Sequence, residues 1–145
     1  MLSNFAGLTL NIPRQWRDIT ADLPSGSVST LACESGIGVI QFSVAKYEQG
    51  TKPRVTPKDL NDLFDAFCKS HSITCIEPMI LDMNNDLYVG GVSNSVQEVI
   101  AVWYLSNGLD LVLVTYTSLQ PNDPLSKAEL RDAIAIVKSI EMSQV

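Results

Sequence analysis

Apolar and β-branched residues recur at every second position through most of this chain, and they are densest between residues 99 and 119. This stretch reads VIAVWYLS, then Asn107-Gly108, then LDLVLVTYTSL. Two such runs joined by Asn-Gly predict a β-hairpin with a two-residue type I′ turn, in which both turn residues adopt positive φ. The predicted register pairs Tyr104 with Leu111.

Both faces of this hairpin are apolar. A strand with one solvated face alternates polar and apolar side chains at period two, whereas Trp103, Tyr104 and Leu105 follow one another and point to both sides. We therefore expect the hairpin in the middle of a sheet, with one helix on each face. The alternative is that one apolar face is left open for a partner.

Shorter alternating segments around the hairpin predict further strands. They cover residues 8–12, 16–19, 27–33, 39–47, 73–81 and 87–92. Pro78 interrupts one of them and predicts an edge strand or a bulge, because proline donates no ladder hydrogen bond. Gly90-Gly91 predicts a bulge or a close approach of two backbones.

Helical periodicity follows two capping signals. Thr56 predicts the N-cap of a first helix, with Pro57 at its first position and Asp59 three residues after the cap. The apolar stripe of this helix comprises Leu60, Leu63, Phe64 and Phe67.

The second helix is predicted to open at Asp123-Pro124, with Ser126 and Glu129 in a capping box. Its inward stripe comprises Leu130, Ala133, Ile134, Val137 and Ile140. The order of strands, helix, strands and helix predicts an α+β fold. We expect a three-layer α/β/α sandwich with a mostly antiparallel sheet, in a single domain over residues 1–145.

Composition is typical of a folded chain. Of its 145 residues, 46% are hydrophobic and 18% are charged, which argues against disorder. No segment approaches the ~18 apolar residues of a membrane span. The first residues lack the basic region and cleavage site of a signal peptide, so we expect a cytoplasmic protein.

Charge is unevenly distributed along the chain. Residues 70–126 contain no Lys or Arg but six acids, so the whole net charge of −6 belongs to this part. Such a field disfavours nucleic acid and anionic membranes and attracts a basic protein. The alternative is that the charge serves solubility alone. The residues expected to contact a partner are Asp82, Asp86, Tyr88, Glu98 and Asp110.

Signals of catalysis or metal binding are weak. His71 is the single histidine, and no nucleophile elbow, P-loop or zinc-protease motif is present. Cys68, His71 and Cys75 have ligand-like spacing without an evident fourth ligand. We therefore expect no catalytic residues, no metal, no cofactor and three reduced cysteines. A small enzyme that uses carboxylates alone stays open as a distant alternative.

Residues 8–18, LTLNIPRQWRD, resemble the opening of the PsbP-like superfamily, which includes the Ran-binding Mog-type proteins. Members often begin with an apolar strand, then Pro, two residues, Trp and a polar pair, as at Pro13 and Trp16. The superfamily's element order and C-terminal helix are also similar to those predicted here.

The resemblance implies a non-catalytic binding module. The bacterial roles it suggests are an immunity protein that neutralises a cognate secreted toxin, and a chaperone or adaptor that holds an effector before type VI secretion. The acidic part of the chain fits an immunity protein facing a basic toxin. An uncovered apolar face of the hairpin fits a chaperone.

Overall fold

The computed structural model of the chain describes residues 2–47, 50, 54–73, 76–80, 87–94 and 97–142. In this described part the first elements are β1 (Leu2–Phe5), β2 (Leu8–Asn11), β3 (Trp16–Asp18), a short 3-10 helix η1 (Thr20–Asp22), β4 (Ser29–Cys33) and β5 (Gly38–Ala45). The chain continues through α1 (Pro57–Ser70), β6 (Ile76–Ile80), β7 (Leu87–Asn94), β8 (Val99–Ser106), β9 (Leu111–Ser118) and α2 (Pro124–Lys138).

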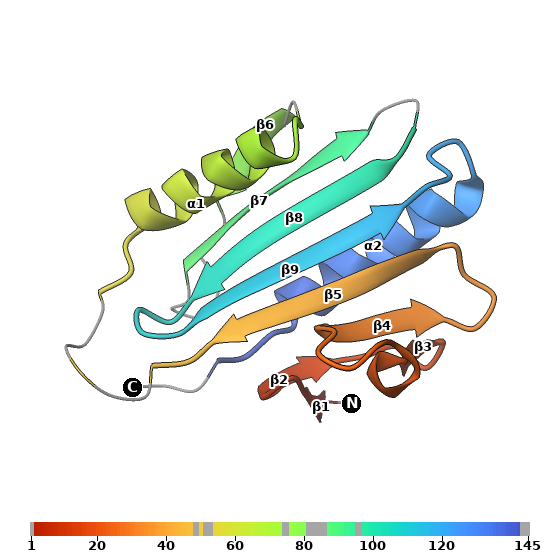
Figure 1. Cartoon of the computed structure of the whole chain (residues 1–145), viewed down its shortest axis with the longest axis horizontal. Coiled ribbons are helices and arrows are strands. Elements are labelled where there is room, and N and C mark those ends of the chain that lie inside the picture. The colour runs from red at the N-terminus through yellow and green to blue at the C-terminus, as the bar shows by residue number, and fades with distance from the viewer. Residues whose placement is uncertain are drawn as a thin grey trace.

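The main sheet has seven strands in the order β3-β4-β5-β9-β8-β7-β6, and every neighbouring pair is antiparallel. A separate pair, β1-β2, lies beside the end of α2, where Thr9 bridges to Glu141. Figure 1 shows the main sheet with α1 and α2 lying along its strands. The predicted α+β fold is confirmed.

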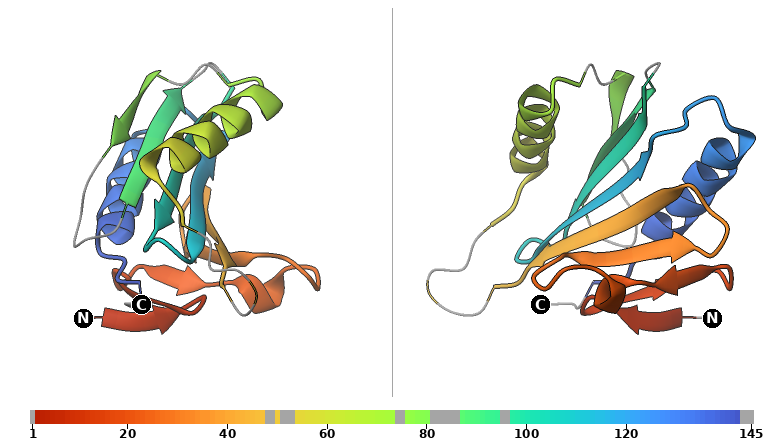
Figure 2. Two further views of the ribbon diagram at one scale, coloured as in Figure 1. Left: turned by 90° about the vertical axis from the view of Figure 1, so that its left-hand side faces the viewer. Right: turned by 45° about the vertical axis from the view of Figure 1, so that its right-hand side comes forward.

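The two helices cover opposite faces of the sheet (Figure 2). On one face, Leu60 and Phe64 of α1 pack with Val102 and Tyr104. On the other face, Ile136 of α2 packs in the larger core together with the alternate strand residues, among them Trp103, Val114 and Tyr116. The β8–β9 hairpin is thus central and has a helix on each side, as its two apolar faces predicted.

The turn of this hairpin differs from the prediction. Tyr104 pairs with Leu113 rather than Leu111, so four residues, not two, connect the strands. Gly108 has φ +98°, whereas Asn107 does not adopt positive φ. Side-chain capping decides the turn, because Asn107 Oδ1 accepts hydrogen bonds from the Leu109 amide at 3.1 Å and from the Asp110 amide at 2.8 Å. The shift is two residues, so each side chain keeps its face.

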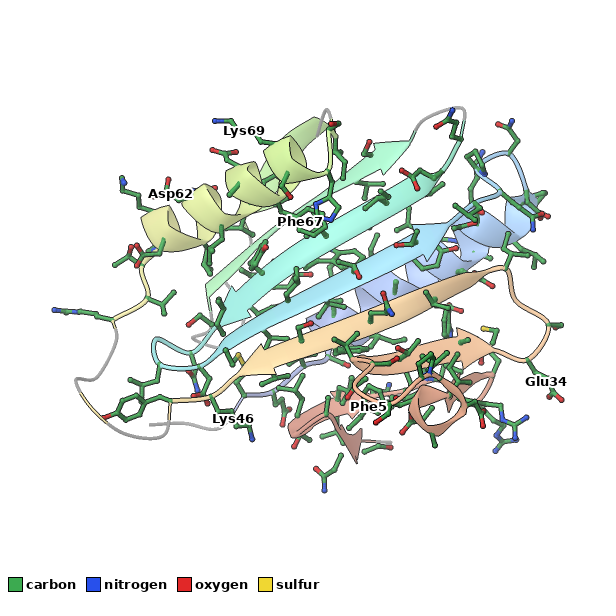
Figure 3. All side chains as sticks on the ribbon, in the orientation of Figure 1. Phe5, Glu34, Lys46, Asp62, Phe67 and Lys69 are labelled. Carbon is green, nitrogen blue, oxygen red and sulfur yellow. The ribbon has the colours of Figure 1, made fainter. Side chains whose placement is uncertain are left out.

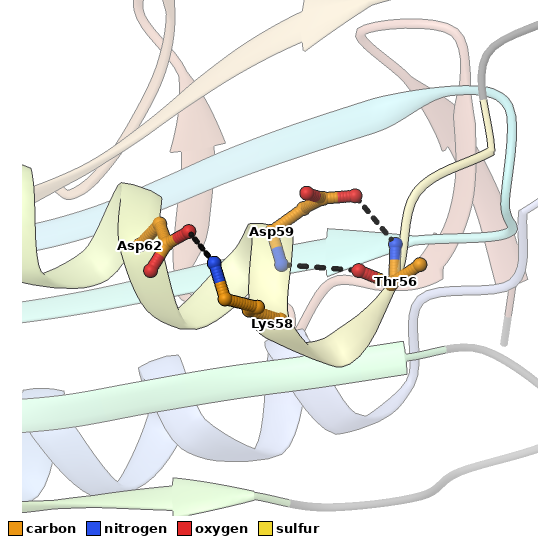
Figure 4. Close-up of polar contacts among 4 residues, drawn as sticks. All are labelled: Thr56, Lys58, Asp59 and Asp62. Atoms are coloured by element: carbon orange, nitrogen blue, oxygen red, sulfur yellow. Dashed lines mark hydrogen bonds and ion pairs between the residues drawn. The ribbon is translucent and has the colours of Figure 1, made fainter.

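The predicted cap of α1 is confirmed. Thr56 Oγ1 accepts a hydrogen bond from the Asp59 amide at 3.2 Å, and the Asp59 carboxylate accepts one from the Thr56 amide at 2.9 Å (Figure 4). One turn further on, Lys58 pairs with Asp62 at 3.2 Å. These reciprocal bonds satisfy two backbone amides at the start of the helix, where amides have no hydrogen-bond partner within the helix itself.

The predicted capping box of α2 is wrong. Asp123 is the N-cap, and its carboxylate accepts a hydrogen bond from the Leu125 amide at 2.9 Å. Ser126 and Glu129 are buried and bind other elements instead. The sequence spacing is that of a capping box, but Pro124 at the first helical position starts the helix three residues earlier.

The edge strands match the sequence in part. β6 lies at the sheet edge, and its register shifts between Ile76 and Met79, as expected from Pro78. Gly90 shows a close approach: a Cβ there would lie 2.2 Å from Trp103. The register of β7 is continuous, so there is no bulge at Gly90. Strand β1 was not expected from its short, polar sequence.

The cysteines differ from the expectation of three reduced thiols. Cys68 is disulfide-bonded and Cys33 is free. Cys75 lies outside the described residues. Neither α1 nor α2 combines the length and hydropathy of a membrane-spanning helix, and the described residues hold no other candidate.

Candidate functional site

Of the residues expected to contact a partner, those that the structure describes lie in different parts of the molecule. Asp82 and Asp86 lie outside the described residues. Glu98 precedes β8 and Asp110 follows it, so an eight-residue strand of about 25 Å separates them. Glu98 and Asp110 therefore lie near opposite ends of β8. Asp110 also has a structural contact, because its carboxylate accepts a hydrogen bond from the Tyr47 amide at 2.8 Å.

Tyr88 does not reach the surface. Its side chain is 4% exposed and belongs to the core on the α2 side of the sheet. Burial raises the pKa of its hydroxyl, which has no hydrogen-bond partner in the described part of the chain. The expectation that Tyr88 contacts a partner is wrong, because β7 pairs with β8 in a register that turns this side chain toward the core.

The best candidate site lies on the side of the sheet that α1 covers only in part. Burial along β8 is almost continuous, whereas β9 alternates between buried and half-buried residues, and β5 alternates in the same way over most of its length. The buried residues of β9 and β5 face α2. Among the described residues, α1 lies over β7 and β8 on the other side, Leu111 and Leu113 of β9 pack against its cluster, and Thr30 of β4 is buried. We call the remaining half-buried side of β5 and β9 the open sheet face.

A hollow of about 270 Å³ lies in the open sheet face. Its lining combines apolar, hydroxyl and amide side chains and contains no Asp, Glu, Lys or Arg. The lining residues are Val28, Gln41, Ser43, Phe67, His71, Ile100, Leu113, Thr115 and Thr117. This neutral surface stands out in a protein of net charge −6.

Sheet register explains why these side chains meet. Gln41 of β5 pairs with Thr115 of β9, and Ser43 pairs with Leu113, so all four point to one side. Gln41 Nε2 donates to Thr30 Oγ1 at 3.4 Å, which ties the floor of the hollow to β4. The hydroxyls of Ser43, Thr115 and Thr117 make no hydrogen bond within the described residues and so face outward for a ligand or solvent.

Two rings, from the last turn and the C-cap of α1, form one wall of the hollow. Phe67 and His71 stack with their centroids 4.1 Å apart and an interplanar angle of 18°. His71 Nδ1 lies 3.0 Å from the Phe67 carbonyl oxygen and 3.0 Å from Ser70 Oγ. Figure 3 shows Phe67 on the side of α1 that borders the sheet. The wall is thus fixed by contacts within α1.

The chemistry of this site favours binding. His71 is the single imidazole in the lining of the hollow, and no lining carboxylate or cysteine accompanies it. Nowhere in the described residues do three His, Cys, Asp or Glu side chains gather as metal ligands would. Hydroxyls, an amide and apolar groups can hold a neutral surface by packing and hydrogen bonds.

A second polar cluster is buried and serves the fold. Glu129 of α2 is 4% exposed, and its carboxylate accepts hydrogen bonds from Tyr116 Oη and the Gly38 amide, both at 2.9 Å, and from the Ile37 amide at 3.1 Å. Glu129 therefore fastens α2 to β9 and to the turn before β5. Sequence reasoning missed this role because the same Ser-x-x-Glu spacing occurs in capping boxes.

Comparison with known proteins gives information on the fold and none on the function. No family model matches the chain, and no curated protein matches it. Among solved structures, it is similar to a crystal structure from Bacteroides thetaiotaomicron, with a TM-score of 0.60 and 11% sequence identity. The match covers 99% of this chain and 48% of that one, so this chain spans about half the length of that neighbour. The PsbP-like resemblance stays a prediction.

Proposed function

We propose that this protein is a non-catalytic protein-binding module whose partner docks on the open sheet face. The observation that carries the proposal is the neutral hollow beside α1, where half-buried Ile100 and Leu113 lie next to outward-facing hydroxyls. Apolar surface of this kind, surrounded by polar groups, is typical of protein-protein contacts. The PsbP-like resemblance of residues 8–18 points to the same class of function.

An immunity protein that neutralises a secreted toxin is the first candidate. The net charge of −6, and the absence of Lys and Arg from residues 70–126, support a basic toxin as partner. In this account the negative field of the whole molecule accelerates association, and the neutral hollow supplies contacts that slow dissociation. This role requires no catalytic group and no cofactor in the chain, and we place it in the cytoplasm.

An effector chaperone or adaptor for type VI secretion is the second candidate. It is favoured by the half-buried apolar side chains that line the hollow, namely Ile100 and Leu113. A chaperone uses such a surface to hold an apolar segment of its effector. The two candidates differ in their effect on the partner's activity, because a chaperone need not block it.

The experiment is co-expression with the protein encoded by the adjacent gene, followed by a titration of that protein's activity. An immunity protein forms a one-to-one complex and inhibits completely at equimolar ratio. A complex that leaves the activity intact supports the chaperone instead. Absence of a complex with the products of both flanking genes contradicts both roles.

Thr115→Arg tests the surface, and Ala135→Arg is the matched control. Thr115 lies in the hollow, whereas Ala135 is exposed on α2, on the opposite side of the sheet. An unpaired charge buried against a neutral partner is costly, so Thr115→Arg should speed dissociation at least about tenfold. Ala135→Arg should leave dissociation unchanged. Equal behaviour of the two variants would place the contact elsewhere.

A further inference from the structure

The open sheet face has the width of one helix. On α1's side of the sheet, α1 packs over the two strands β7 and β8, which leaves β9 and β5 beside it, because Thr30 of β4 is buried on this side. At about 4.8 Å between neighbouring strands, two strands occupy a width of about 10 Å. An α-helix with its side chains is about 10–12 Å in diameter. The uncovered area is thus the place of one further helix in that layer, next to α1.

Backbone hydrogen bonding excludes an extended segment from this place. β4, β5 and β9 are interior strands whose backbone groups are already paired with neighbours on both sides. A peptide strand gains its main-chain hydrogen bonds at a sheet edge, which here means β3 or β6. Laid across the open sheet face, an extended segment would bury unpaired amides and carbonyls. A helix satisfies its own backbone and avoids that cost.

The side chains of the hollow define which helix face fits. The lining carries no formal acid or base apart from His71, so a Lys, Arg, Asp or Glu pressed against it would lose hydration without gaining a partner. Ile100, Leu113 and Phe67 offer apolar contact. Ser43, Thr115 and Thr117 offer hydroxyls that both donate and accept, which match Ser, Thr, Asn or Gln.

We propose that the open sheet face receives an α-helix of the partner protein, which lies beside α1 and presents an uncharged face of small apolar and hydroxyl residues. The proposal rests on the proposed function and names the partner element. The partner helix completes the layer that α1 begins, and Phe67 and His71 contact its flank.

The test uses two peptide libraries displayed on phage, one built on a helical scaffold and one linear, selected against the whole protein. We expect binders from the helical library whose varied face is rich in Ala, Leu, Ser and Thr. Thr115→Arg should weaken these binders at least about tenfold, and Ala135→Arg should not change their affinity. Ser43→Arg, at an exposed position of the same face, replaces Thr115→Arg if that variant does not fold.

The outcomes separate this inference from the proposed function. Linear binders that are weakened by Thr115→Arg would overturn the helix and leave the surface in place. Helical binders with a charged contact face that are weakened by the same variant would overturn the proposed chemistry of the partner. Binders that are indifferent to both arginine variants of the hollow, or no binders at all, would overturn the surface and with it the proposed function.

Discussion

Two tyrosines show how burial alone fails to define the role of a residue. Tyr88 and Tyr116 are both buried in the core on the α2 side of the sheet. Tyr116 donates to Glu129 at 2.9 Å, and its pKa is raised by burial and by that carboxylate. Tyr88 has no partner for its hydroxyl among the described residues. The sequence showed both as apolar strand positions and could not assign partners that come from another element.

Removing each hydroxyl should have opposite consequences. Tyr88→Phe takes away an unsatisfied buried polar group, so the free energy of unfolding should stay unchanged or rise. Tyr116→Phe leaves the Glu129 carboxylate with one hydrogen bond fewer and should lower the free energy of unfolding by about 1–3 kcal/mol. Urea unfolding of the two variants measures both effects. Equal losses would contradict the assigned partners.

The thiol of Cys33 should react slowly. Burial, Glu129 and Asp132 raise its pKa to about 11. The thiolate is the reactive form. The rate of alkylation should therefore be low at pH 8 and should rise about tenfold for each pH unit between pH 8 and pH 10. After denaturation without reductant, thiol titration should find fewer than three thiols per chain, because Cys68 is disulfide-bonded. Three reactive thiols would contradict the disulfide.

Elements follow the sequence where a local rule is strong. The consecutive residues Trp103, Tyr104 and Leu105 correctly predicted a strand with cover on both faces. Pro57 and the Thr56–Asp59 pair correctly predicted where α1 begins. The hairpin turn failed, because the side chain of Asn107 bonds the turn amides and selects a longer loop. The open sheet face could not be foreseen, because it depends on how many strands α1 covers.

The cap of α1 should weaken in acid. Hydrogen bonds from Thr56 lower the pKa of Asp59 below 3.8. A carboxylate whose pKa is lowered on folding stabilises the folded state at pH values above its ordinary pKa. This contribution is lost as the pH falls through the pKa that the carboxylate has in the folded state. Thr56→Ala should lower the free energy of unfolding by about 1 kcal/mol at pH 7 and by less below pH 3.8. A loss that is independent of pH would contradict the reciprocal bonds.

Trp16 joins β3 to α2. Its ring is 4% exposed and its Nε1 donates to Asp132 at 3.0 Å. Trp16→Ala should therefore lower the free energy of unfolding by about 3–5 kcal/mol, through lost burial and a cavity. Thermal melting measures this effect, with Gln15→Ala as a control that removes an exposed hydrogen bond to the same carboxylate. An unchanged melting temperature for Trp16→Ala would contradict a structural role.

At the scale of the whole molecule, the proposed binding mode assigns association to the negative charge and slow dissociation to the neutral hollow. Surface charge raises the association rate, and this gain falls as the Debye length shrinks from about 10 Å at 0.1 M salt to about 3 Å at 1 M. Contacts in the hollow contain no formal acid or base apart from His71 and should depend little on salt. The sequence revealed the charge, whereas the hollow required the fold.

Methyl NMR of the complex tests the docking surface most directly. With the co-expressed partner bound, the methyl signals of Val28, Ile100 and Leu113 should shift, because these side chains line the hollow. Leu2 and Leu125 are exposed outside the hollow and serve as internal controls whose signals should not move. Shifts at Leu2 or Leu125 with unchanged signals from the three lining residues would contradict binding on the open sheet face.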